Sequence, residues 1–89
     1  MSDQKKNKTI HSKEYHLMIS LLREMRENKG VTQKDLADII NVDQTFISKI
    51  EGGERRLDFL ELRTICIALE VSVLDFVKEM EKRIINKRR

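Results

Sequence analysis

The chain has 89 residues, with 37% charged and 39% hydrophobic residues, no Pro, no Trp, three Gly and a formal net charge of +3. This length and helix-forming composition predict one all-α domain with a modest core. The sequence has no apolar run of the roughly 20 residues that a membrane span needs, and no apolar stretch that would form a signal peptide. Cys66 is the single cysteine, so an internal disulfide is excluded. The sequence therefore predicts a cytoplasmic protein with no membrane partner.

The positive charge lies at the two ends of the chain. Residues 1–14 hold four lysines against two acidic residues, and residues 82–89 hold five basic residues and no acidic one. The rest of the chain is therefore net acidic. The overall charge is therefore weak evidence that the protein binds nucleic acid, and such binding must be inferred from where individual basic residues lie.

The sequence predicts three segments. Residues 1–11 form a flexible basic N-terminal arm, residues 12–85 form the folded domain with an extended C-terminal helix, and residues 86–89 form a basic tail. A solvated tail is the simpler interpretation of the arm. The alternative is an arm that contacts DNA phosphates or a minor groove.

A first helix is predicted over residues 12–29, with Ser12 as its N-cap and Gly30 at its end. Apolar residues recur in it at steps of three and four, which is the pattern of a helix with one buried face. These residues are Tyr15, Met18, Ile19, Leu22 and Met25. Arg26 lies at the edge of this stripe.

Residues 32–53 predict two short helices joined by a tight turn. Thr32 is the expected N-cap of the first, with Asp35 placed for a near capping box. Asn41 in the turn tolerates a left-handed backbone better than most residues. Asp43 is the expected cap of the second helix, which the glycines at 52 and 53 end.

The second of these helices separates into two faces. At about 100° per residue, Phe46, Ile47 and Ile50 point inward, and the outward side carries only polar and cationic residues. The outward residues are Gln44, Thr45, Ser48 and Lys49. A helix of this width fits the major groove of B-DNA, so we expect these four to contact base edges. Arg55 and Arg56 follow where phosphates would lie.

This stretch resembles the helix-turn-helix of the phage-repressor, or Xre/Cro-type, regulators. The matching residues are Gln33, Leu36, Ala37, Val42, Gln44, Ile47, Ser48, Ile50, Glu51 and Gly53. The resemblance, which runs from about residue 22 to 77, implies a compact five-helix lambda-repressor-like DNA-binding domain with the helix-turn-helix at its second and third helices. It also implies that Gln33 contacts a phosphate and supports Gln44, and that Arg26 pairs with Glu51.

The C-terminal part predicts two more helices, beginning after Asp58 and at Ser72. Cys66 fits the apolar pattern of the first as a core residue. Members of the resembled family often have Gly where Glu70 stands, so a strained or differently shaped turn is expected there. In the last helix, Leu74 and Val77 are the expected core positions. An apolar stripe formed by Val73, Phe76, Met80 and Ile84 predicts a homodimer interface. The alternative is a helix end that folds back on the chain's own core.

The chain carries no P-loop, no dinucleotide-binding glycine motif, no H-E-x-x-H and no C-x-x-C. His11, His16 and Cys66 are the only imidazole and thiol side chains, so a metal site would have to consist mostly of carboxylates, and none is expected. No nucleophile-base pair is found either, so no cofactor and no enzyme activity are expected.

The predicted function is a sequence-specific, double-stranded DNA-binding transcriptional regulator that acts as a homodimer on a pseudo-palindromic operator. An antitoxin or protein-interaction module, with a toxin or polymerase as partner, is the alternative. The segments NVDQTFIS and LEVS resemble restriction-modification controller proteins, although phage repressors and antitoxins share much of the pattern.

Overall fold

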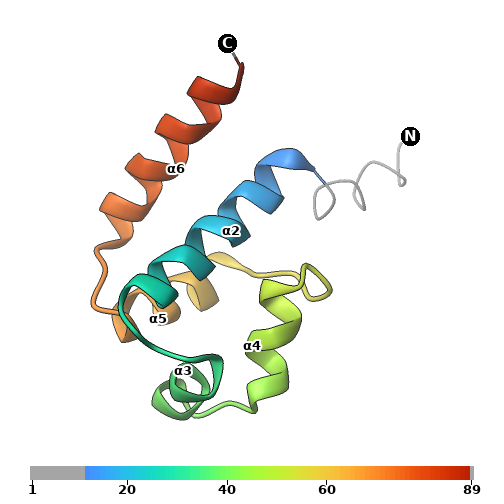
Figure 1. Cartoon of the computed structure of the whole chain (residues 1–89), viewed down its shortest axis with the longest axis vertical. Coiled ribbons are helices and arrows are strands. Elements are labelled where there is room, and N and C mark those ends of the chain that lie inside the picture. Colours follow the sequence, from blue (N-terminus) through green and yellow to red (C-terminus); the bar gives the residue numbers. More distant parts are fainter. Residues whose placement is uncertain (1–11, 89) are drawn as a thin grey trace.

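The computed structural model describes residues 12–88, and the expected N-terminal arm lies outside them. The described residues form five helices and no strand (Figure 1). The helices are α2 (Lys13–Asn28), α3 (Gln33–Ile40), α4 (Gln44–Glu51), α5 (Phe59–Ala68) and α6 (Val73–Arg88). The all-α fold with a helix-turn-helix, α3 and α4, is confirmed. None of the helices over residues 12–88 is long and apolar enough to cross a membrane.

Most helix ends follow the local sequence signals. Ser12 Oγ accepts the Tyr15 N–H over 3.0 Å at the start of α2. Thr32 with Asp35 and Asp58 with Glu61 form reciprocal capping boxes at the starts of α3 and α5. Each cap needs only residues within one turn, which explains why the sequence predicts it.

The start of α4 differs from the expectation. Asp43 occupies the N-cap position with an extended backbone, but its side chain makes no cap hydrogen bond. The preceding turn is instead held by its backbone, since Asn41 is left-handed (φ 62°) and the Val42 N–H donates to the Ala37 carbonyl over 2.9 Å. The first turn of α4 therefore lacks the side-chain support that the other helices have.

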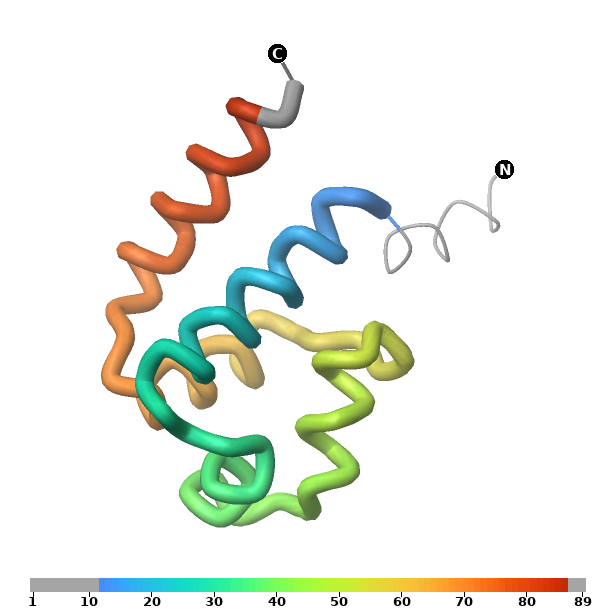
Figure 2. The backbone as a smooth tube through the Cα atoms, viewed as in Figure 1, coloured from blue at the N-terminus to red at the C-terminus, as the bar shows by residue number. Residues whose placement is uncertain are grey.

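All five helices contribute to one core. Figure 2 shows α2 running between α6 on one side and α4 on the other. The largest side chains with less than 2% exposure are Leu21, Leu36, Ile47, Ile50, Ile65, Cys66 and Phe76. Cys66 is a core residue, as expected, and burial raises the pKa of its thiol.

The structure corrects the predicted faces of α6. Phe76 is 0% exposed, and Val73 and Met80 pack against the core, so this stripe covers the chain's own interior and is not a free interface. Of the two expected core residues, Val77 packs against the core, whereas Leu74 is 72% exposed. The predicted interface stripe therefore lies on the buried side of α6, about one residue, or about 100° around the helix, from the exposed side. Ile84 is half-buried, and α6 continues beyond residue 85 to Arg88.

The helix orientation is set by contacts that are distant in sequence. Arg83 of α6 donates to both carboxylate oxygens of Glu24 in α2, over 3.1 and 3.0 Å, and also pairs with Glu79. The hydrogen bonds from Arg83 lower the pKa of Glu24. Together with the buried Phe76 ring, this pair places α6 against α2.

The turn between α5 and α6 holds Glu70 in the left-handed region (φ 59°), with its N–H donating to the Ile67 carbonyl over 3.0 Å. Left-handed backbone costs an L-residue about 1–2 kcal/mol, because Cβ approaches the carbonyl oxygen. We expect Glu70→Gly to raise the free energy of unfolding by about 1 kcal/mol and the melting temperature by about 4–8 °C. Thermal unfolding by circular dichroism measures this. Glu70→Ala is the control, and an equal gain from Ala would show that side-chain loss, not backbone strain, is responsible.

Candidate DNA interface

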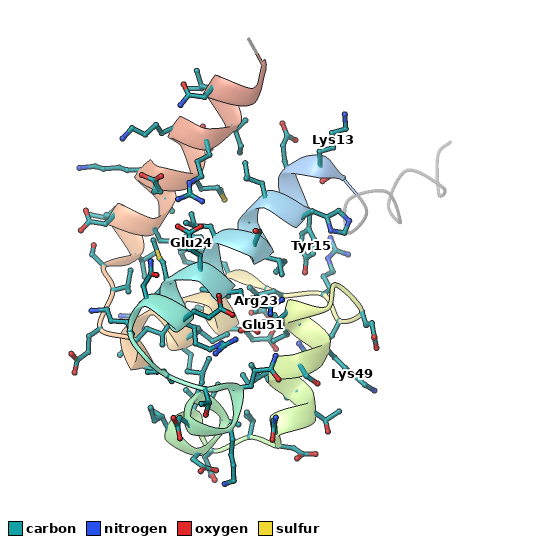
Figure 3. The ribbon with its side chains drawn as sticks, in the orientation of Figure 1. Lys13, Tyr15, Arg23, Glu24, Lys49 and Glu51 are labelled. Carbon is teal, nitrogen blue, oxygen red and sulfur yellow. The ribbon has the colours of Figure 1, made fainter. Side chains whose placement is uncertain are left out.

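The outward face of α4 is the candidate interface, and it has the polarity expected from the sequence. Gln44, Thr45 and Lys49 are exposed, while Ile47 and Ile50 on the opposite side are 1% exposed. Figure 3 shows Lys49 pointing away from the body of the molecule. The side chains of Gln44, Thr45 and Lys49 make no hydrogen bond or ion pair with any of residues 12–88. Their donors and acceptors are therefore available to a ligand.

Ser48 is the fourth residue of this face and differs from the others. It is partly buried, and its Oγ donates to the Thr45 carbonyl over 3.2 Å. In this conformation its hydroxyl oxygen offers only acceptor capacity to the outside. The exocyclic amino groups of adenine and cytosine are the matching donors in a major groove.

A buried polar cluster supports α4 from behind. Arg26 is 6% exposed, and its Nε and Nη2 donate to Glu51 Oε2 and Oε1 over 2.6 and 2.9 Å. The Glu51 side chain is 5% exposed, and Figure 3 shows it directed inward. These hydrogen bonds raise the pKa of Arg26, against the opposing effect of burial. The two residues that the sequence analysis paired thus form a bidentate ion pair.

Arg26 and Glu51 have further partners. Arg26 Nη2 lies 3.9 Å from Glu27 Oε2, a weak ion pair with an exposed carboxylate. Arg26 Nη1 donates to the Val31 carbonyl over 2.6 Å, which ties in the chain before α3. Gln33 Nε2 donates to Glu51 Oε1 over 2.9 Å. Within residues 12–88, Gln33 makes no hydrogen bond to Gln44, and the expected support of Gln44 on DNA stays a prediction. One amide N–H of Gln33 is not used by this contact with Glu51.

Two neighbouring arginines after α4 have different surroundings. The Arg55 Nη1 and Nη2 atoms donate to Glu61 Oε1 and Oε2 over 3.1 and 3.0 Å, and its guanidinium carbon lies 4.3 Å from the centre of the Phe46 ring. Arg56 is exposed and has no side-chain partner among residues 12–88. Sequence reasoning missed Glu61 as a partner, although its place in the Asp58 capping box was a signal that it lies near this loop.

Tyr15 holds the same loop from the other side. Its hydroxyl accepts the Leu57 N–H over 2.8 Å and donates to the Arg55 carbonyl over 3.5 Å. The ring is 7% exposed, and Figure 3 places it between α2 and the chain that follows α4. The apolar stripe placed Tyr15 in the core but gave no signal for these contacts.

A helix-turn-helix family profile matches residues 22–76, more than half of the chain. The chain belongs to the helix-turn-helix family. The family match covers the end of α2, all of α3, α4 and α5, and the beginning of α6. It therefore includes every residue of the candidate interface and of the Arg26–Glu51 cluster.

Individual members of the helix-turn-helix family are similar to this chain over most of their length. The control protein C.MunI of Mycoplasma sp is 29% identical over 62 residues, which are 68% of this chain and 84% of that protein. The wild-type restriction-modification controller protein C.Esp1396I is 36% identical, with 84% and 97% of the two chains covered and a TM-score of 0.77. An XRE-family-like protein from Pseudomonas syringae pv. tomato str. DC3000 is 36% identical, with 88% and 95% covered and a TM-score of 0.78.

One further structure contains DNA. It is the C.Esp1396I tetramer in complex with its natural 35-base-pair operator, at 36% identity, with 83% of this chain and 97% of that chain covered and a TM-score of 0.76.

Among the residues that the structure describes, no group of three or more His, Cys, Asp and Glu side chains is arranged to hold a metal ion.

Proposed function

We propose that this protein is a sequence-specific, double-stranded DNA-binding regulator of transcription that acts as a homodimer on a pseudo-palindromic operator. The observation that carries the proposal is the outward face of α4, whose free polar side chains stand on a helix that is fixed from behind by the Arg26–Glu51 pair. The operator complex of C.Esp1396I supports the same function for this similar chain. A face without large apolar residues is less suited to a purely protein-binding role.

Within this proposal, Gln44, Thr45, Ser48 and Lys49 contact base edges. The Gln44 amide offers one donor and one acceptor side by side, which matches adenine N7 and N6 in the major groove. Gln33, through its remaining amide N–H, and Arg56 contact phosphates, which fix the register of α4 without carrying sequence information.

Selection of bound sequences from random duplex DNA tests the function. Wild-type protein is expected to enrich one pseudo-palindromic sequence, whereas enrichment of none would contradict the proposal. Gln44→Ala is expected to cost about 1–3 kcal/mol at the selected site and to relax the preference at one base position of each half-site. Asn86→Ala, which removes an exposed amide from α6, is the control with unchanged preference. If Gln44→Ala kept the full preference, its base-contacting role would be wrong.

The dimer surface must differ from the one predicted from sequence. Leu74 is 72% and Ile85 52% exposed, and they are eleven positions apart, so they lie within about 20° of each other around α6. Val77 packs against the core and is not part of this surface. We name Leu74 and Ile85 the α6 outer face and propose it as the isologous dimer contact, with Ile84 at its edge.

A further inference from the structure

Arg55 joins two helices through one side chain. Its guanidinium stacks over the ring of Phe46 in α4, at 4.3 Å, and makes two hydrogen bonds to the Glu61 carboxylate in the first turn of α5. Glu61 is itself fixed, since its Oε1 accepts the Asp58 N–H over 3.1 Å. We name Phe46, Arg55 and Glu61 the Arg55 clamp.

The clamp acts on the part of α4 that has least support of its own. Phe46 directly follows Gln44 and Thr45, and it is only partly buried. The Asp43 side chain provides no cap hydrogen bond to this turn. A cation over an aromatic ring is electrostatically attracted to it, so the Arg55 guanidinium ties this turn of α4 to the loop that follows the helix.

The clamp also changes what Arg55 can do for DNA. A phosphate would have to compete with Glu61, which already neutralises the guanidinium with two charge-assisted hydrogen bonds. Arg56, next to it, is exposed and carries an unpaired charge among the described residues. Only one of the two arginines is therefore free to contact a phosphate.

Building on the proposed function, we propose that Arg55 is a positioning residue for specificity: it fixes the first turn of α4, and with it Gln44 and Thr45, while Arg56 supplies the phosphate contact. This assignment departs from the sequence expectation that both arginines hold phosphates. Two conservative variants separate the roles. Lys in place of Arg55 keeps the charge that a phosphate needs but loses the planar stack and the paired hydrogen bonds. Gln in place of Glu61 keeps a capping-box side chain at the start of α5 but removes the charge that holds Arg55.

The experiment measures affinity of the full-length chain for the selected operator and for a scrambled duplex at several salt concentrations. Arg55→Lys and Glu61→Gln are expected to lower the ratio of the two affinities by roughly tenfold, with an unchanged salt dependence for Arg55→Lys. Arg56→Ala is expected to weaken binding to both duplexes equally and to reduce the salt slope by about 0.9 for each phosphate that the protein no longer neutralises. A wild-type ratio in both Arg55→Lys and Glu61→Gln overturns the clamp.

A second measurement tests the clamp without DNA. Amide hydrogen exchange of Phe46 and Ile47 in the free protein is expected to speed up by several-fold in Arg55→Lys, with amides of α6 unchanged. Arg56→Ala is the matched control with wild-type exchange. If the wild type selected no DNA sequence, the proposed function would fail, and unchanged exchange in Arg55→Lys would separately reject the clamp.

Discussion

Glu51→Ala is expected to lower the free energy of unfolding by about 3–5 kcal/mol, because it leaves the Arg26 cation buried without its hydrogen-bonded counter-charge and with only the exposed Glu27 carboxylate 3.9 Å away. Arg26 is 6% exposed, and of its three hydrogen bonds only the one to the Val31 carbonyl would remain. The Gln33 amide would lose its acceptor as well. Urea denaturation followed by circular dichroism measures the change, and operator binding should weaken because α4 loses its support.

Glu24→Ala is the control for this prediction. Glu24 also accepts two hydrogen bonds from an arginine, Arg83, but its side chain is 47% exposed against 5% for Glu51. An exposed pair contributes at most about 1 kcal/mol, since water screens it. Equal losses in Glu51→Ala and Glu24→Ala would show that burial does not set the importance of the Arg26–Glu51 pair.

The parts of the fold that sequence could predict are those set by neighbouring residues. The capping box of Thr32 and Asp35, and the left-handed turn at Asn41, depend on side chains within one turn of helix. Glu70 is a similar case, because a turn that commonly takes Gly forces its backbone conformation on whatever residue stands there. The polarity of α4 followed because its apolar residues occupy one narrow face.

The parts that sequence could not predict depend on how distant segments meet. Apolar residues occupy about half of the circumference of α6, so periodicity alone did not decide whether Phe76 or Leu74 faces the core. That choice is made by docking on α2, where Arg83 and Glu24 are 59 residues apart. The partners of Arg55 depend in the same way on the path of the chain between α4 and α5, and no spacing rule describes that path.

The dimer proposal makes a prediction that the corrected orientation of α6 sharpens. Leu74→Glu combined with Ile85→Glu should give a folded monomer, because both side chains are more than half exposed and neither belongs to the core. In an isologous contact each new carboxylate would lie near its own symmetry copy, so like charges would meet across the interface. Sedimentation at micromolar concentrations measures the assembly, and circular dichroism checks the fold.

The loss of dimerisation should reduce operator affinity by about 100-fold or more, because the second half-site is then no longer bound intramolecularly. Two recognition helices in a dimer lie about 34 Å apart, or a multiple of it, and the selected operator should show that half-site spacing. Lys82→Glu is the control, since it changes the net charge by the same amount as the double variant but lies outside the α6 outer face. A wild type that sediments as a monomer and binds its operator singly would reject the dimer, whereas a double variant that remains dimeric would place the interface on another surface.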